Sequence, residues 1–235
     1  MKRDSPEDEK DRLEALNRYG VLDTPPDQAF DAITRLASRF FEVPICLISL
    51  VDEDRIWFKS IQGLDAEEVG RAPGLCASVI LSDEAHIIEN AIDDPRTLAN
   101  PLVAGELGLR FYAGIPLKTH DGFRLGSMAI IDFEPRMLSD EEVGDLEDFA
   151  GLVMDEMELR LSARSTVHSL RKLLVLAREG AEWEDFVTIC AWSNRIKVGE
   201  KWISYDDFLR DHLGMSVSHG IHPDVVQKLK ENEDH

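Results

Sequence analysis

The stretch 43–64, VPICLISLVDEDRIWFKSIQGL, constrains the fold more than any other part of the chain. Its first half, residues 43–51, is apolar on both faces and rich in β-branched residues, a pattern typical of a buried central strand. The polar residues 52–54 have the length of a hairpin turn. The second half alternates between two faces, Ile56, Phe58 and Ser60 against Trp57, Lys59 and Ile61. The stretch therefore predicts a central β-hairpin with one strand fully buried and its partner half buried.

Helices are expected on both sides of this hairpin in the sequence. Apolar residues at helical spacing predict a first helix that ends at Gly20 and a second one that Asp27 caps. Further strands are expected at 86–91, 111–118 and 123–133, with a short helix at 75–81 and a loop at 65–74. The long connection 91–109 is of the kind that usually carries function. Ser139 and Glu142 form a capping box that starts a last, long helix.

The motifs around the hairpin resemble those of a known family. They are YGVLDTPPDQAFDAITRLAS before it and LCASVI, DDPR, NPLV, LRFYAGIPLKTHDGFRLGSMAIID and PRMLSDEEVGDLEDFA after it. In this order, over about residues 11–161, they resemble the GAF sensory domains of bacterial signalling proteins. The resemblance implies an α+β fold, an α/β sandwich whose antiparallel central sheet is flanked by helices, with a GAF domain at 1–162. It leaves the ligand open, because this fold hosts many functions.

The helix after Ser139 has two interpretations. Apolar or small residues recur at alternating three-four spacing at Val143, Leu146, Ala150, Val153 and Met157. The pattern weakens at Arg160 and Arg164 and resumes near Val167. One interpretation is a core helix followed by a second helix. The other is a dimerising coiled coil, which the GAF resemblance favours, because such a helix commonly joins this domain to its output. On this basis, residues 163–180 are expected to be a helical linker or coiled coil.

Residues 181–235 form a separate small module. They resemble a C-terminal module of bacterial signalling proteins that carries four cysteines, of which only Cys190 remains here. Cys190, His219 and His222 could supply three zinc ligands, and the spacing of the two histidines suits such a site. The loss of the other expected thiols favours a metal-free module over a zinc site.

Composition narrows the function classes. The net charge is −20, and no run of Lys and Arg offers a basic face, which argues against binding to nucleic acid or to an anionic membrane surface. Three cysteines are too few for a disulfide framework and indicate a reducing compartment. The N-terminus lacks the pattern of a signal peptide, and no apolar run reaches the ~20 residues that span a bilayer. The expected location is therefore cytoplasmic.

A small-molecule pocket is the first candidate site. In GAF domains the ligand lies on one face of the sheet beneath long loops, and by position the resemblance implies seven candidates: Trp57, Cys76, Asp94, Arg96, Asn100, Phe111 and Tyr112. They combine an apolar lining with a few polar groups, as ligand sites do. The alternative is that these residues maintain the fold. The motifs of the GAF domains that bind cyclic nucleotides or attach bilins are absent, so the small molecule and any cofactor remain unidentified.

Two catalytic alternatives arise. A related fold reduces free methionine sulfoxide with several cysteines, which needs a reactive thiolate and a resolving thiol. Only Cys46 and Cys76 lie in the domain, and Cys46 falls in the buried strand. His168 faintly resembles a phosphorylated histidine, but no ATP-binding region follows it. The sequence thus predicts a sensory protein that is not an enzyme. It is expected to form a homodimer and to signal to a downstream protein. The alternative is a ligand-free interaction module.

Overall fold

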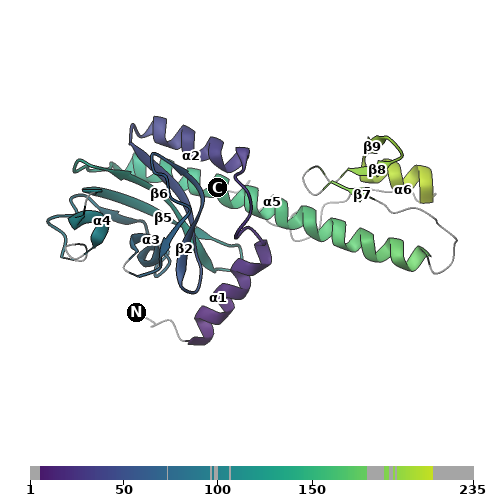
Figure 1. Ribbon diagram of the computed structural model, residues 1–235, viewed down its shortest axis with the longest axis horizontal. Coiled ribbons are helices and arrows are strands. Elements are labelled where there is room, and N and C mark those ends of the chain that lie inside the picture. The colour runs from purple at the N-terminus through teal and green to yellow at the C-terminus, as the bar shows by residue number, and fades with distance from the viewer. Residues whose placement is uncertain are drawn as a thin grey trace, which may run out of the picture. The chain divides into compact units, whose positions relative to one another are not determined.

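The computed structural model describes residues 6–72, 74–95, 97, 100–105, 107–178, 188–190, 193 and 195–213. The chain divides into two compact units, Met1–Leu161 and Ser162–His235. The larger unit has the expected α+β architecture, an antiparallel sheet with helices on both faces (Figure 1).

The sheet of the larger unit has the strand order β3-β2-β1-β6-β5-β4, and all of its pairs are antiparallel. Its strands are β1 (Ile45–Val51), β2 (Arg55–Gln62), β3 (Glu68–Gly70), β4 (His86–Ile88), β5 (Phe111–Lys118) and β6 (Arg124–Asp132). As the apolar run predicts, β1 lies in the middle of the sheet, and every residue of β1 is buried. The prediction of a pure loop at 65–74 is wrong, because this segment adds the short edge strand β3.

The strict alternation predicted for β2 is also wrong. Ser60 pairs with Ile48, whereas Phe58 pairs with the next residue of β1, so Lys59 is the extra residue of a β-bulge. Because of the bulge, Phe58 and Ile61 pack against the same cluster instead of facing opposite sides. The bulge turns the Lys59 ammonium toward the loop before α2, where it donates to the carbonyl oxygen of Pro25 at 2.9 Å.

Three helices cover one face of the sheet, α1 (Pro6–Tyr19), α2 (Gln28–Phe40) and α5 (Asp140–Arg178). Two of them begin at the predicted caps. The Asp27 carboxylate accepts from the backbone N–H of Ala29 at 3.0 Å. Ser139 and Glu142 form the reciprocal capping box, with bonds of 2.8 and 3.2 Å. These caps satisfy backbone donors that the first helical turn would otherwise leave without partners.

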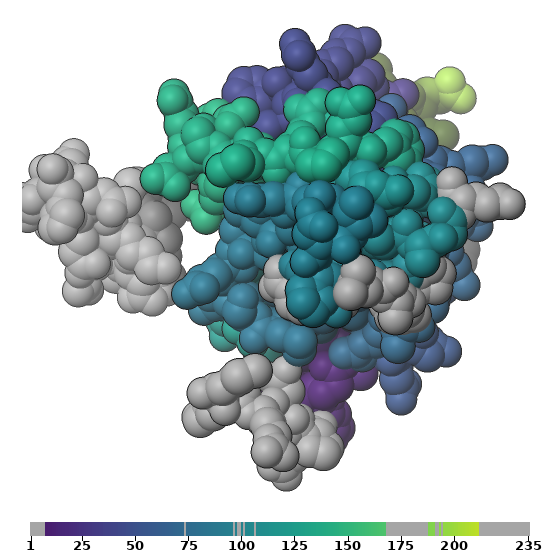
Figure 2. Space-filling model, turned by 90° about the vertical axis from the view of Figure 1, so that its left-hand side faces the viewer, coloured from purple at the N-terminus to yellow at the C-terminus, as the bar shows by residue number. Residues whose placement is uncertain are grey.

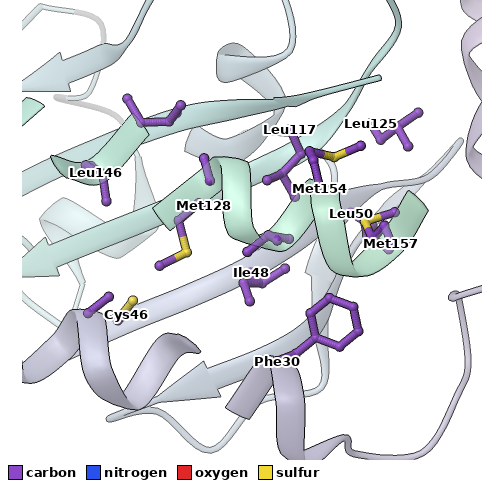
Figure 3. Packing of buried hydrophobic residues seen from close by; sticks show 14 of the residues in the cluster. Phe30, Cys46, Ile48, Leu50, Leu117, Leu125, Met128, Leu146, Met154 and Met157 are labelled. Carbon is purple, nitrogen blue, oxygen red and sulfur yellow. The ribbon is translucent and has the colours of Figure 1, made fainter. Parts of the chain in front are cut away.

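Residues from all three helices close a large apolar core against β1, β5 and β6 (Figure 3). In the close-up, Met154 and Met157 of α5 lie over Ile48 and Leu50 of β1, with Phe30 of α2 beside them. The inward side chains of α5 are those whose spacing suggested a coiled coil, Leu146, Ala150, Val153 and Met157. Up to Met157, this stripe therefore belongs to the core of the domain.

The opposite face carries α3 (Leu75–Val79) and α4 (Pro101–Ala104), which close a second apolar core with Ile45, Leu47 and Tyr112. Figure 1 shows α3 and α4 on the side of the sheet away from α2.

In the smaller unit, the described residues form a three-stranded antiparallel sheet and one helix. These elements are β7 (Thr188–Ile189), β8 (Ile196–Val198), β9 (Lys201–Ile203) and α6 (Tyr205–Leu213). Ile196, Phe208 and Leu209 form its buried cluster. Among the described residues of both units, no helix combines the length and the apolar character that crossing a membrane would require.

Candidate functional site

The pocket candidates lie on both faces of the sheet. Trp57 and Phe111 belong to the core beneath α1, α2 and α5, whereas Cys76 and Tyr112 belong to the core beneath α3 and α4. The split follows from strand periodicity, because Phe111 and Tyr112 are neighbours on β5 and point in opposite directions. Of the candidates, Cys76 and Tyr112 therefore form a direct pair, while Trp57 and Phe111 lie on the other side.

Cys76 of α3 and Tyr112 of β5 belong to a row of buried polar side chains between α3 and the sheet. The Tyr112 hydroxyl donates to the Cys76 sulfur at 3.4 Å. Farther along the same face, the hydroxyl oxygens of Ser49 and Ser127 lie 2.9 Å apart. Burial raises the pKa of Tyr112 well above its ordinary value, Cys76 adds to the effect, and a hydrogen bond with Ser127 opposes it. We call these four residues, Ser49, Cys76, Tyr112 and Ser127, the polar row.

The polar row stands out because it is buried in an apolar environment. Ser49 and Ser127 are fully buried, and Cys76 and Tyr112 are nearly so. Buried hydroxyl groups cost free energy unless they are hydrogen-bonded, and here they bond to one another. A signal for Ser49 existed in the sequence, since its hydroxyl interrupts the apolar run 45–51.

Gly114 makes room for the Tyr112 ring. A Cβ atom at Gly114 would lie 2.7 Å from the Tyr112 hydroxyl oxygen and 2.9 Å from a methyl carbon of Val79 in α3. Only glycine therefore lets the phenol ring lie flat along β5 beneath α3. His86 of the neighbouring strand meets the same ring edge-on, with 6.2 Å between centroids.

The described part of the connection 91–109 is held by its own hydrogen bonds. The Thr97 hydroxyl lies 2.6 Å from the carbonyl oxygen of Ala91 and 3.0 Å from that of Asp94. The Asn100 side chain accepts from the backbone N–H of Leu102 at 2.9 Å, as a cap of α4 does. The Asn100 side chain therefore helps to order its own loop at the start of α4. Arg96 lies outside the described residues.

The two cysteines of the domain lie on opposite faces of the sheet. Cys46 of β1 faces the core beneath α2 and α5, whereas Cys76 of α3 lies in the core on the opposite face of the sheet. Burial raises the pKa of the Cys46 thiol to about 12, so at neutral pH it is not a thiolate. The sheet separates these two thiols, which disfavours a direct exchange between them.

The metal prediction falls largely outside the described residues, because His219 and His222 lie there. The sulfur of Cys190 accepts from the backbone N–H of Ser193 at 3.4 Å. Within the part of the chain that the structure describes, no group of three His, Cys, Asp or Glu side chains is arranged to hold a metal ion.

A polar anchor joins α5 to the domain. Arg160 of α5 forms an ion pair with Asp27, the cap of α2, and a 2.6 Å bond with Glu156 of its own helix. The Arg160 guanidinium also lies over the Phe30 ring, 4.7 Å from its centroid. The apolar spacing weakens at Arg160 because this side chain is the anchor, a role that the sequence analysis missed. The long-range partner, 133 positions away, leaves no signal in a local pattern.

A second contact lies two residues before the anchor, at Glu158. The Tyr19 hydroxyl donates to the Glu158 carboxylate at 2.5 Å, and the His120 ring nitrogen lies 3.1 Å from the same oxygen. Tyr19 ends α1, and His120 lies in the turn between β5 and β6. The two contacts attach α5 to α1, to the cap of α2 and to a strand turn.

A six-stranded antiparallel sheet, a long C-terminal helix on one face and a loop-covered core on the other define a class of small sensory domains. A family model described as the GAF domain matches residues 25–157. The chain belongs to the GAF domain family.

Comparisons with individual proteins add a bacterial relative. The chain is 43% identical over 150 residues to "Cyclic di-GMP phosphodiesterase PA2567" of Pseudomonas aeruginosa, a match that covers 63% of this chain and 26% of the relative. This chain therefore matches only about a quarter of the length of that protein.

Two solved structures are similar over most of their own length. The GAF domain of an Acinetobacter phosphoenolpyruvate-protein phosphotransferase is 18% identical with a TM-score of 0.48, over 66% of this chain and 94% of that one. The free methionine-R-sulfoxide reductase of Neisseria meningitidis is 15% identical with a TM-score of 0.48, over 70% and 96%.

Proposed function

We propose that the chain is a regulatory signalling protein without catalysis of its own, whose GAF domain binds a small molecule beneath α3. The observation that carries the proposal is the polar row, four buried polar side chains at the centre of an apolar face. Ligand sites typically combine an apolar surround with a few directed polar groups. A bound molecule would exchange hydrogen bonds with Tyr112 and its neighbours, which now bond to one another.

The signal would pass through the sheet to α5. Tyr112 of the polar row and Phe111 of the opposite core are adjacent on β5, so a shift of this strand reaches both faces. On the far face, α5 is attached by Arg160 and Glu158. A ligand that binds better to one position of β5 than to another would shift the position of α5. The output would be a downstream protein, reached through a homodimer in the cytoplasm.

The relative from Pseudomonas aeruginosa fits a regulatory role. That protein is named a cyclic di-GMP phosphodiesterase, and this chain matches 26% of its length. We propose that the shared region supplies regulation in both proteins, while the phosphodiesterase activity in the name is not assigned to this chain.

The test is native mass spectrometry of the full chain purified from its own host, compared with its denatured mass. Retention of a small molecule, and its loss in Tyr112→Phe, is the expected result. Tyr205→Phe in the smaller unit is the matched control and should retain the molecule. An empty wild-type chain that also binds no compound from a metabolite extract would favour the ligand-free interaction module. A mass increase equal to zinc would instead support the C-terminal metal site.

The thiol-dependent reductase remains the remote alternative. It would show turnover of free methionine sulfoxide with a dithiol reductant, and Cys76→Ser would abolish that turnover. The separation of Cys46 and Cys76 by the sheet argues against it. No turnover in the wild-type chain is the expected result.

A further inference from the structure

The helix α3 is part of the cover that separates the polar row from solvent. Its Cys76 sulfur accepts from the Tyr112 hydroxyl at 3.4 Å, and a Cβ atom at Gly114 would lie 2.9 Å from a methyl carbon of Val79. The helices α2 (indigo) and α5 (green) cover the other face of the sheet, and in Figure 2 they lie above the blue to teal part of the larger unit. A movement of α3 therefore need not displace α2 or α5.

The N-terminal end of α3 is packed tightly against the sheet. A Cβ atom at Gly74, the residue before α3, would lie 2.2 Å from a methyl carbon of Ile56 in β2 and 2.9 Å from the carbonyl oxygen of Arg71. The Arg71 guanidinium donates to the carbonyl oxygens of Asp52 and Glu53 in the turn between β1 and β2, at 3.0 and 3.1 Å. Close packing and bonds to the main chain thus fix this end of α3.

The C-terminal end of α3 is held by charged side chains instead. The Arg124 guanidinium donates through Nε to the carbonyl oxygen of Ile80, the residue after α3, at 2.5 Å. Another nitrogen of the same guanidinium pairs with one Asp83 oxygen at 2.9 Å, and the Lys118 ammonium pairs with the other oxygen at 2.8 Å. Lys118 and Arg124 face each other at the end of the β5–β6 hairpin. We call Asp83, Lys118 and Arg124 the latch.

The latch is open to solvent. The Asp83 side chain is 53% exposed, and residues 81–84 are all exposed, so apolar packing does not hold this segment. Lys118, and after it Arg124, hold the pKa of Asp83 below its ordinary value, which keeps the carboxylate charged at neutral pH. Exposed ion pairs contribute little to stability, and salt screens them. This end of α3 can therefore detach while the rest of the domain stays folded.

We propose that α3 is a lid over the polar row that opens at its C-terminal end, and that the latch sets how often it opens. Lifting Val79 away from Gly114 uncovers the Tyr112 ring, while the packing at Gly74 keeps the other end in place. The role of the lid rests on the proposed function, because opening would admit the small molecule to the polar row. The opening itself is measured without any ligand.

Cys76 supplies the probe for this opening. Its thiol is buried between α3 and the sheet, so N-ethylmaleimide, an uncharged thiol reagent, reaches it only when α3 lifts. Cys46 of β1 is fully buried beneath the helices of the other face, and its labelling reports unfolding of the whole domain. Peptide mass spectrometry of the full chain gives the two rates separately. In the wild-type chain Cys76 should react at least about 10-fold faster than Cys46.

The variant Asp83→Asn removes both ion pairs of the latch at nearly constant side-chain size. It should raise the labelling rate of Cys76 about 3- to 5-fold and leave the rate of Cys46 unchanged. Asp121→Asn is the matched control, because Asp121 lies in the turn of the same hairpin and pairs with Arg18 at 2.8 Å, but it holds α1 instead of α3. This control should label at the wild-type rate.

Salt and a pair of further variants sharpen the test. Raising the salt concentration from about 0.05 M to about 1 M should accelerate the labelling of Cys76 in the wild-type chain, because it screens the latch. The same change should have little effect in Asp83→Asn, where the latch is already broken. Arg124→Met should accelerate labelling more than Lys118→Met does, since Arg124 also holds the carbonyl oxygen of Ile80.

The outcomes separate this inference from the proposed function. Labelling of Cys76 at the wild-type rate in Asp83→Asn would overturn the latch. Equal rates for Cys76 and Cys46 in every variant would overturn the lid, since α3 would then open only when the domain unfolds. Binding of a small molecule is measured independently by native mass. A chain whose latch responds as expected but that binds no compound would count against sensing only, and ligand retention with a closed lid would count against the lid only.

Discussion

The two faces of the GAF sheet are built differently. Beneath α1, α2 and α5, buried polar groups attach helices to the rest of the domain, as the Asp27–Arg160 ion pair and the 2.8 Å contact between the Thr34 and Ser60 hydroxyl oxygens do. Beneath α3 and α4, buried hydroxyl groups lie in the middle of the strands and bond to one another. The first arrangement fixes a long helix in one position. The second arrangement, beneath α3 and α4, places hydroxyl groups at positions where apolar side chains would need no hydrogen-bond partners.

This difference indicates which face stabilises the fold and which face can respond to a ligand. An ion pair with one buried partner is costly to break, because the remaining charge has no compensation. A hydrogen bond between neutral groups is worth much less, and its partners can be exchanged. The helix-bearing face should therefore respond strongly to substitution, whereas the polar row should tolerate conservative changes and report on ligands.

The largest expected effect comes from the anchor. Arg160→Met keeps the apolar length of the side chain but leaves the Asp27 carboxylate buried without its cation, and Asp27 is almost fully buried. We expect a loss of about 3 kcal/mol in the free energy of unfolding. Urea unfolding of the full chain, followed by tryptophan fluorescence, would measure it.

The control adds Asp27→Asn to this variant. Asparagine keeps the cap of α2, since it still accepts from the N–H of Ala29, but it carries no charge. The double variant should therefore recover a large part of the loss. Equal stability of the single and double variants would mean that Arg160 acts through its packing on Phe30 and not through the ion pair.

The next effect tests the crowding on the α3 face. Gly114→Ala places a methyl group against the Tyr112 hydroxyl and Val79, and overpacking of this kind costs about 1–3 kcal/mol. Addition of Tyr112→Phe removes the oxygen at 2.7 Å and should restore part of the stability. Chemical unfolding of both variants gives the comparison. No recovery in the double variant would place the strain on the contacts that remain, the ring carbon of residue 112 and the Val79 methyl carbon, both at 2.9 Å.

Much of this fold could be predicted because its signals are local. The apolar run of β1, the cap at Asp27, the capping box at Ser139 and the turn at Gly122 each depend on a few adjacent residues. Physical chemistry of short segments fixes such features. They are also the features that the structure confirms.

The features that could not be predicted depend on partners distant in sequence. At the bulge the Lys59 ammonium donates to the Thr24 hydroxyl at 2.8 Å, and Thr24 lies 35 positions earlier, where no local pattern points to it. The division of Phe111 and Tyr112 between two cores follows from strand register. The pocket prediction grouped both residues by their place in the sequence, and strand alternation separates them.

A smaller effect is expected at the polar row itself. Tyr112→Phe removes the hydrogen bond to the Cys76 sulfur, which is a weak acceptor, and the hydrogen bond with Ser127, whose hydroxyl keeps Ser49 as a partner. We expect a loss of about 1 kcal/mol in the free energy of unfolding. Urea unfolding checks the value against Tyr205→Phe. A loss as large as that of Arg160→Met would erase the difference between the two faces and assign the phenol a structural role.

The smallest effect concerns the edge of the helix-bearing face, where α1 begins. The Arg12 hydrogen bond lowers the pKa of Glu9 to about 2; burial opposes this shift, and Arg71 adds to it. The unfolded chain titrates near the ordinary value of about 4.3. Because the folded pKa is depressed, this contribution is complete above about pH 5 and is lost as the pH falls toward 2.

The variant Glu9→Gln should therefore melt below the wild-type chain at pH 7 and approach it as the pH falls to 3. Thermal unfolding at steps of pH would show the two curves converging. Glu14→Gln is the control, since Glu14 is exposed and its ion pair with Lys10 measures 3.7 Å; its difference from wild type should be small at every pH. A constant difference between Glu9→Gln and wild type across the pH range would mean that the Glu9 side chain stabilises α1 by packing rather than by charge. The ion pairs of Arg12 and Arg71 with Glu9 would then contribute little to stability.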